Sequence, residues 1–137
     1  MKLTPYLIFG GNCAAAFAFY KEYLGGQNLN LMPFRGSPME DQVPEQSRDM
    51  IMHASIELGA TVLMGSDCPP SQPYGGIHGC SMTLSVASDA EAERIFNVLA
   101  QNGKITMPLA ATFWSSKFGM LTDQFGVAWM VMCDKPQ

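Results

Sequence analysis

Residues 50–67 read Met-Ile-Met-His-Ala-Ser-Ile-Glu-Leu-Gly-Ala-Thr-Val-Leu-Met-Gly-Ser-Asp, and this run predicts a single β-hairpin. Two segments rich in apolar and β-branched residues flank Gly59-Ala60, and a glycine at the first central position suits a two-residue type II′ turn. Such a turn sets Ser55 opposite Met64 and His53 opposite Ser66. Because side chains alternate between the two faces of a strand, one face is apolar and suited to burial under a helix. The other face is mixed and carries Ile51, His53, Ser55, Glu57, Val62, Met64 and Ser66.

The mixed face suits either solvent or the wall of a ligand cavity, in which a few polar groups stand on an apolar lining. His53 is the central residue in either case. In a cavity, a histidine hydrogen-bonds a ligand, acts as an acid or base near neutral pH, or anchors a water molecule. In a core strand, it donates to a neighbouring hydroxyl such as that of Ser66. The sequence leaves both roles open, and we expect ligand contact.

Composition indicates one globular domain that needs no disulfides. The chain has 137 residues, of which 47% are hydrophobic and 15% charged, and its net charge of −4 argues against a nucleic-acid partner. The cysteines, at positions 13, 68, 80 and 133, form no CxxC or His-Cys cluster and predict free thiols in a reducing cytoplasm. Pro5 and Gly10-Gly11 interrupt the apolar N-terminal run, which therefore does not predict a secretion signal, and no run is long enough to span a membrane. We expect a cytoplasmic protein.

The order strand, helix, strand and hairpin occurs twice along the chain. In the first half it is predicted at residues 3–9, 13–24 and 28–34, followed by a long mobile loop at 35–49 and then the hairpin. A Pro- and Gly-rich linker covers residues 68–79, and the pattern resumes at 80–87, 88–103, 105–109 and 116–132. The offset between the copies is about 75 residues, most visibly at Met32-Pro33 and Met107-Pro108. We therefore predict an α+β fold, a single domain of two βαβββ modules at about residues 1–67 and 80–137.

Local signals also predict how the two helices begin and end. Asn12 is expected to cap the first helix, and Ser88-Asp89-Ala90-Glu91 is a capping box for the second. Gly103 is expected to end the second helix. Its buried stripe is predicted to comprise Ala92, Ile95, Phe96 and Leu99.

Motifs spread over nearly the whole chain resemble one known family. They include Pro5-Tyr6-Leu7-Ile8-Phe9, Met52-His53-Ala54, Leu63-Met64 with Ser66-Asp67, Thr112-Phe113-Trp114 and Asp123-Gln124-Phe125-Gly126-Val127. With the twofold βαβββ repeat, they resemble the PhnB-like branch of the vicinal oxygen chelate superfamily, which includes glyoxalases, extradiol dioxygenases and fosfomycin and bleomycin resistance proteins. The resemblance implies curved mixed sheets that line a ligand cavity. Some proteins of this branch are named demethylubiquinone methyltransferases, but this chain has no Gly-x-Gly-x-Gly turn after a strand.

The resemblance also implies where a metal would be bound. In the metal-dependent members, four ligands, which are His, Gln or Glu, come one from each end strand of the two repeats. These positions correspond to Pro5, Met64, Ser81 and Met130. None of the four is a ligand for a hard metal, since thioethers favour soft Cu(I) and a lone serine is weak. The neighbouring positions add no histidine or carboxylate, so we expect neither a metal nor another cofactor.

Other residues are candidates for ligand contact. Met82 and Met130 would give an adaptable lining, although methionine fills cores more often than it makes sites. Trp114 is either an amphipathic wall for a flat ligand or part of the core. Asp67 could reach the cavity mouth, but capping a turn is its simpler role. With His53, the candidate set is Ser55, Met64, Ser66, Asp67, Met82, Trp114 and Met130.

Three classes of function remain. The first is a metal-free protein that binds a small organic ligand, which would need only a cavity with aromatic and polar walls. The second is a metal-independent enzyme of the isomerase, lyase or transferase type that uses His53 as general base. The third is a metal-dependent glyoxalase or dioxygenase, which the ligand positions disfavour. We prefer the first, because one histidine with no visible partner acid or nucleophile falls short of a catalytic constellation. Each module leaves strand edges and an inner face uncovered, so we also expect a homodimer.

Overall fold

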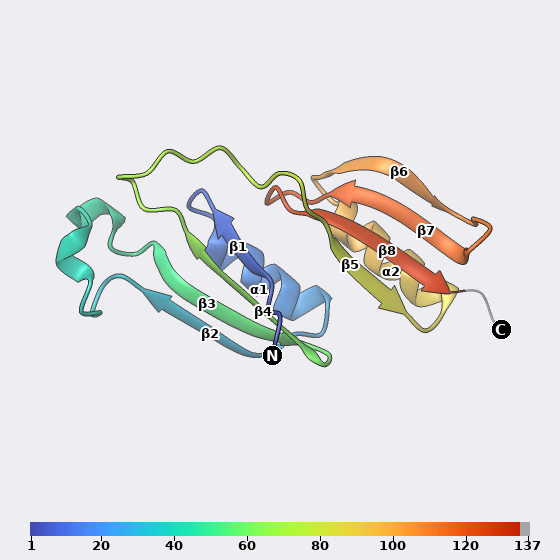
Figure 1. Cartoon of the computed structure of the whole chain (residues 1–137), viewed down its shortest axis with the longest axis horizontal. Helices are drawn as coiled ribbons and strands as arrows, with labels where there is room; N and C mark the ends of the chain where they lie inside the picture. The colour runs from blue at the N-terminus through green and yellow to red at the C-terminus, as the bar shows by residue number, and fades with distance from the viewer. Residues whose placement is uncertain (135–137) are drawn as a thin grey trace. The chain divides into compact units, whose positions relative to one another are not determined.

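The computed structural model describes residues 1–134 and divides into two compact units, unit 1 over Met1–Gly76 and unit 2 from Ile77 onward. Figure 1 shows the same element order in each. Unit 1 contains β1 (Tyr6–Phe9), α1 (Cys13–Tyr23), β2 (Gln27–Pro33), β3 (Ile51–Leu58) and β4 (Thr61–Asp67). Unit 2 contains β5 (Met82–Val86), α2 (Asp89–Ala100), β6 (Lys104–Ala110), β7 (Ser115–Thr122) and β8 (Ala128–Asp134). The predicted α+β class with a twofold βαβββ repeat is confirmed, and the division falls inside the predicted linker.

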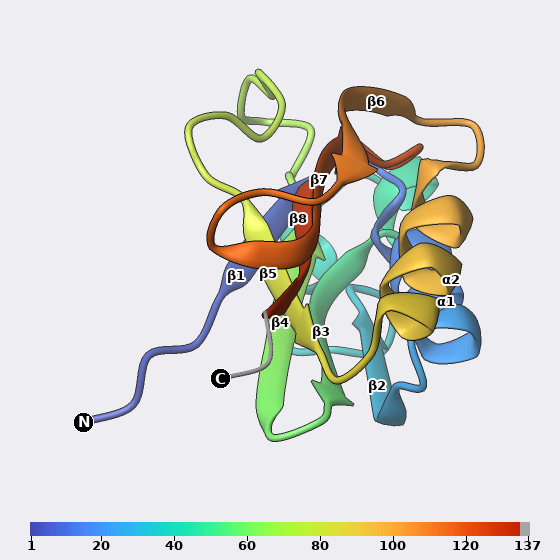
Figure 2. The ribbon, with the colours of Figure 1, turned by 90° about the vertical axis from the view of Figure 1, so that its right-hand side faces the viewer.

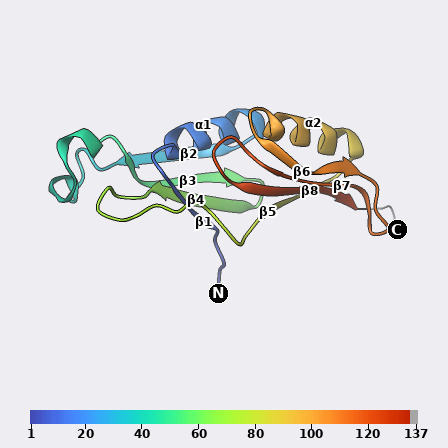
Figure 3. The ribbon, with the colours of Figure 1, turned by 90° about the horizontal axis from the view of Figure 1, so that it is seen from above.

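Each unit has one four-stranded mixed sheet. The strand orders are β1-β4-β3-β2 and β5-β8-β7-β6, and in each the first strand runs parallel to the last while the other neighbours are antiparallel. A helix that follows the first strand packs across the strands of its own sheet. Figures 2 and 3 show each helix against one side of its own sheet. Each sheet thus has one face covered by a helix and one face that its own helix leaves free.

The β3–β4 hairpin has the predicted register. Ser55 pairs with Met64 and Ile56 with Leu63. Gly59 has a φ of +60° whereas Ala60 does not have a positive φ, which is the sign pattern of a type II′ turn. The predicted apolar face is covered by α1, because Ile56 is 0% exposed and the ring of Phe17 lies against Gly65.

Helix α2 also follows its sequence signals. The Ser88 hydroxyl oxygen accepts a hydrogen bond from the Glu91 backbone N–H at 3.2 Å, as a capping box requires. The predicted stripe is buried at all of its positions: Ala92, Ile95, Phe96 and Leu99. The helix end differs from the prediction. It is Asn102, with a φ of +57°, that adopts the left-handed conformation after the helix, and Gly103 follows it into the loop.

A buried carboxylate organises the β7–β8 hairpin. One oxygen of Asp123 accepts from the backbone N–H groups of Phe125 and Val127, and the other accepts from Trp129 Nε1 at 2.8 Å. Trp129 is 2% exposed and lies on the helix side of the sheet. Asp123 thus stabilises the turn between β7 and β8, and the same side chain satisfies the buried indole N–H.

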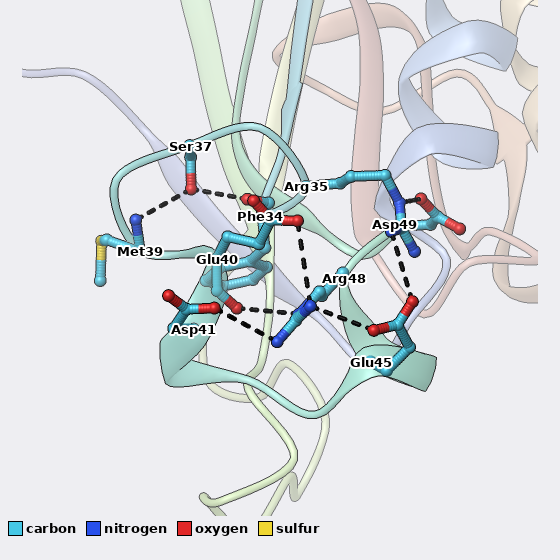
Figure 4. Close-up of polar contacts among 9 residues, drawn as sticks. All are labelled: Phe34, Arg35, Ser37, Met39, Glu40, Asp41, Glu45, Arg48 and Asp49. Atoms are coloured by element: carbon cyan, nitrogen blue, oxygen red, sulfur yellow. Dashed lines mark hydrogen bonds and ion pairs between the residues drawn. The ribbon is translucent and has the colours of Figure 1, made fainter.

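The predicted long loop between β2 and β3 is more ordered than expected. It contains two short 3-10 turns, Glu40–Gln42 and Glu45–Ser47. Arg48 holds them together through Glu45 Oε2 at 3.1 Å and the Glu40 backbone carbonyl at 3.1 Å, as Figure 4 shows. Arg35 bonds Asp49 Oδ1 at 2.8 Å. Both arginines are therefore engaged with acidic and carbonyl oxygens of their own loop, which explains them without an anionic ligand.

Candidate functional site

The face of the unit 1 sheet that points away from α1, which we call the open face, gathers half of the predicted site residues. The register pairs Tyr6 and Ser55 with Met64, and Met32 with His53. Paired residues of neighbouring strands point to the same side of a sheet, whereas the alternate residues of β1 and β3 are buried toward α1. The open face carries Tyr6, Ile8, Met32, His53, Ser55, Met64 and Ser66. Of the predicted set, His53, Ser55, Met64 and Ser66 lie on it together.

The partner of His53 is Tyr6. The Tyr6 hydroxyl oxygen lies 3.3 Å from His53 Nδ1. The two rings are tilted by 32° with their centroids 5.7 Å apart. The alternative in which His53 is held by the Ser66 hydroxyl is not what the structure shows. A second polar side chain therefore joins His53 on the open face.

Sequence reasoning did not select Tyr6, because the first superfamily position was counted to Pro5. The parallel register instead sets Tyr6 beside Met64, while the Pro5 carbonyl accepts a hydrogen bond from the Met64 backbone N–H at 3.0 Å. The alternation in β1 carried the missing signal: Leu7 and Phe9 are apolar and buried, so Tyr6 and Ile8 must take the opposite face.

The imidazole of His53 has one free edge. Within residues 1–134, Tyr6 is its only hydrogen-bond partner, and this contact uses Nδ1. No buried side-chain nitrogen or oxygen in this part of the chain lacks a partner, so Nε2 must be accessible. His53 therefore offers Nε2 to a ligand or to water.

The surroundings of His53 combine apolar side chains with hydroxyl groups and are nearly uncharged. Met64 and Ser55 are half-buried, Ser66 is buried, and Tyr6 is 45% exposed. Strands β1 to β4 contain no lysine or arginine. A few polar groups on an apolar wall are typical of a site for a small organic molecule.

Asp67 has a structural role at the start of α1. Its Oδ1 accepts from the backbone N–H groups of Gly11 at 3.1 Å and Cys13 at 3.0 Å, and its Oδ2 accepts from that of Ile51 at 2.8 Å. The side chain is 3% exposed. Asn12, the predicted cap, makes no capping hydrogen bond with its side chain. Asp67 therefore replaces Asn12 as the helix cap and has its oxygens occupied, so a capping role, the simpler of the two predicted for it, is found in place of the cavity mouth.

The thiol of Cys13 lies beside this cap. Burial raises its pKa to about 12, and the negative charge of Asp67 adds to the effect. A thiolate is the nucleophilic form of cysteine, so Cys13 is chemically inert near neutral pH.

The candidate residues in unit 2 do not share one face of its sheet. Met82 pairs with Trp129 and therefore lies on the side that α2 covers, which differs from the predicted lining. Met130 lies on the opposite side, where its neighbour across the pair is Met120. Trp114 precedes β7, is 47% exposed and packs edge-on against Phe118 with a centroid distance of 5.5 Å. Of these three, Met130 and Trp114 remain available for contact with a ligand.

The residues do not fit the metal centre that the superfamily implies. In the two parallel registers, Tyr6 pairs with Met64 and Thr83 pairs with Met130. The third of the four metal-ligand positions therefore moves from the predicted Ser81 to Thr83. Thioethers and neutral hydroxyls are poor ligands for Fe, Mn, Ni or Zn. Across residues 1–134, no three His, Cys, Asp or Glu side chains come close enough to hold a metal ion.

A surface hollow of about 330 Å³ lies where β2 ends and β3 begins. Strand residues Leu31, Met32, Pro33 and Met52 line it together with residues 35–38. None of the predicted site residues contributes to it. Of the residues that line the hollow, Met32 is the one that also belongs to the open face, where it is the strand partner of His53.

Comparison with solved structures identifies the fold. The chain superposes on a glyoxylase/bleomycin resistance protein/dioxygenase domain from Frankia sp. EAN1pec with a TM-score of 0.67 at 13% identity, covering 98% of this chain and 93% of that one. At this identity the likeness shows the fold alone. The fold is therefore that of the glyoxalase/bleomycin resistance proteins, as the sequence predicted.

The family follows from closer matches. A family model described as 3-demethylubiquinone-9 3-methyltransferase matches residues 1–132, and the chain belongs to this family, in its PhnB-like branch. Protein YjdN of Escherichia coli (strain K12) is 36% identical over 145 residues, covering 100% of this chain and 98% of YjdN. Protein PA1353 from Pseudomonas aeruginosa is 51% identical with a TM-score of 0.90, over 99% of both chains. A putative 3-demethylubiquinone-9 3-methyltransferase, PhnB protein, from Bacillus cereus is 25% identical with a TM-score of 0.77, over 97% and 99%.

No helix among residues 1–134 combines the length and the apolar character needed to cross a bilayer. All of the cysteines in this range are free thiols.

Proposed function

We propose that this protein binds a small, partly apolar organic molecule on the open face of unit 1 without the help of a metal. The observation that carries the proposal is the accessible Nε2 of His53, next to Tyr6 and Met64 on a sheet face with no lysine or arginine. Polar groups of this kind orient a ligand, and the thioether of Met64 adapts to its apolar part.

A metal-independent enzyme with His53 as general base is the second candidate. General acid–base chemistry needs a nitrogen that reaches the substrate, and Nε2 is the nitrogen that Tyr6 does not engage. However, the one side chain that bonds His53 is a tyrosine, and no carboxylate or nucleophile completes a catalytic set around it within residues 1–134. The binding function therefore remains the stronger proposal.

The test replaces His53 with alanine. A site histidine has water as a substitute partner, so the variant should lose no more than about 1 to 2 kcal/mol of unfolding free energy while ligand binding weakens. Thermal melts and a mass-spectrometric screen of small molecules measure the two effects side by side. His78→Ala is the matched control, because it removes the other histidine of the chain, in the exposed linker. A large stability loss with unaltered binding would refute the site.

Metal independence has its own test. A tight metal site would raise the stability of the fold by several kcal/mol at saturating metal, through mass action. We expect no increase in melting temperature with added Ni, Mn, Fe or Zn. About one metal per chain, retained after dialysis against a chelator, would contradict this part of the proposal.

We further propose that two chains form a twofold symmetric homodimer in the cytoplasm. The exposed strand edges and the apolar residues Ile8 and Met32 offer surface that a second copy would cover. Free thiols are consistent with a reducing compartment. Light scattering at micromolar concentration should give twice the chain mass, and a monomer would contradict the dimer.

A further inference from the structure

We infer that Tyr6 fixes the protonation of His53 so that the site offers an N–H donor, and that the ligand therefore presents a neutral acceptor oxygen such as that of a ketone, aldehyde, ester or amide. This inference rests on the proposed binding function and specifies the chemistry of the ligand.

The first step is the direction of the Tyr6–His53 hydrogen bond. A phenol hydroxyl is a stronger donor than a neutral imidazole N–H, and an unprotonated imidazole nitrogen is a stronger acceptor than a phenol oxygen. Across the 3.3 Å contact, Tyr6 therefore donates and His53 Nδ1 accepts. A neutral imidazole carries one proton, so that proton resides on Nε2.

The second step is the availability of that proton. Within residues 1–134, Nε2 has no hydrogen-bond partner and is not a buried unpaired atom. An N–H group close to apolar side chains such as Met64 and Ile8 costs free energy if a ligand covers it without accepting its proton. A ligand on the open face must therefore place an acceptor there.

The third step is the charge of the ligand. Strands β1 to β4 contain two charged residues, Glu57 and Asp67. Glu57 accepts from Asn28 Nδ2 at 2.6 Å, and Asp67 is buried as the cap of α1. A carboxylate or phosphate would meet no lysine or arginine from these strands, and a cation would face the N–H donor. A neutral acceptor oxygen needs no lysine or arginine as a partner, and it can accept a hydrogen bond from the N–H donor.

The same geometry bears on catalysis. A general base needs an unprotonated nitrogen directed at the substrate, and in this arrangement the unprotonated nitrogen is directed at Tyr6. The Tyr6–His53 pair thus favours recognition of an oxygen over removal of a proton.

The protonation is tested first without a ligand. Nitrogen-15 NMR of the imidazole side chains at pH 8 reports which nitrogen carries the proton, because histidine is ordinarily neutral there. We expect a single Nε2–H form for His53 and a mixture of both forms in Tyr6→Phe, with the signal of His78 unchanged between the two proteins. An Nδ1–H form in the unaltered protein, or the same form in both proteins, would overturn the inference.

The ligand chemistry is tested with two probes of the same shape, acetophenone and α-methylstyrene, which differ in having C=O or C=CH2. The carbon-13 methyl signal of Met64, assigned with Met64→Leu, reports occupation of the open face. Acetophenone should bind about threefold to tenfold more tightly, which is the worth of one hydrogen bond, and it alone should shift the His53 N–H signal.

The outcomes separate the two proposals. If both probes shift Met64 with equal affinity, the binding function stands and the inference of an acceptor oxygen is refuted. If neither probe shifts Met64 or His53 at millimolar concentration, both are refuted.

Discussion

Replacing Asp67 with asparagine should destabilise the protein through the three backbone N–H groups that share its carboxylate. These groups belong to Gly11, Cys13 and Ile51, at distances of 3.1, 3.0 and 2.8 Å. Asparagine keeps one oxygen, so its amide NH2 must face at least one of these donors. The variant therefore tests whether the carboxylate is structural.

The magnitude follows from the number of bonds. A hydrogen bond to a charged acceptor contributes about 1.5 to 3 kcal/mol and one to a neutral acceptor about 0.5 to 1.5 kcal/mol. If the asparagine oxygen stays at Gly11 and Cys13, the bond to Ile51 is lost and the other two weaken. The expected loss of unfolding free energy is about 3 kcal/mol, which lowers the urea midpoint by about 1 to 2 M.

The assay is urea unfolding followed by far-ultraviolet circular dichroism. Asp134→Asn is the matched control, since Asp134 ends the last strand of unit 2 as Asp67 ends that of unit 1 but is exposed. The Asp134→Asn variant should change the free energy of unfolding by less than about 0.5 kcal/mol. A loss below about 1 kcal/mol in Asp67→Asn, together with weaker ligand binding, would refute the structural role and restore Asp67 to the site.

Trp129→Phe should cost about 1 to 3 kcal/mol of unfolding free energy, because the bonded carboxylate is left without the buried indole N–H, whereas Trp114→Phe on the surface should be nearly neutral in the same urea assay. Gly65→Ala should lose about 1 to 3 kcal/mol, since its Cβ would lie 2.8 Å from a backbone oxygen, and Gly75→Ala, with open space around it, serves as control in thermal melts. In the native protein at pH 8, about one cysteine per chain should react with a disulfide reagent, and Cys80→Ser should abolish this reaction, because the remaining cysteines are buried. Rapid reaction of several thiols in the folded variant would contradict the last expectation.

Features set by neighbouring residues could be predicted from the sequence. The β3–β4 register depends on the turn at Gly59-Ala60, and the buried stripe of α2 depends on helical spacing, so both are local. The Ser88 cap is local in the same way. Each of these predictions is confirmed.

Features set by distant residues could not be predicted. The parallel pairing of β1 with β4 brings Tyr6 beside Met64, and the pairing of β5 with β8 brings Met82 beside Trp129, without a turn to fix either register. A count along the chain therefore chose Pro5 instead of Tyr6, and Met82, which was expected in the lining as an adaptable methionine, lies on the α2 side. The candidate site was thus only half predictable: His53 came from the hairpin, but its partner came from a strand far away in sequence.

The two helices begin by different means, and this sets when each can form during folding. Ser88 caps α2 from within its own first turn, so that helix can nucleate from its local sequence. The N–H of Cys13 at the start of α1 depends on Asp67, which arrives only when β4 has docked. Because closing the loop between the two costs chain entropy first, the start of α1 should form late, together with its sheet. Pulse-labelled hydrogen exchange should accordingly protect the amides of α2 before that of Cys13, so that two units with the same architecture fold in different orders.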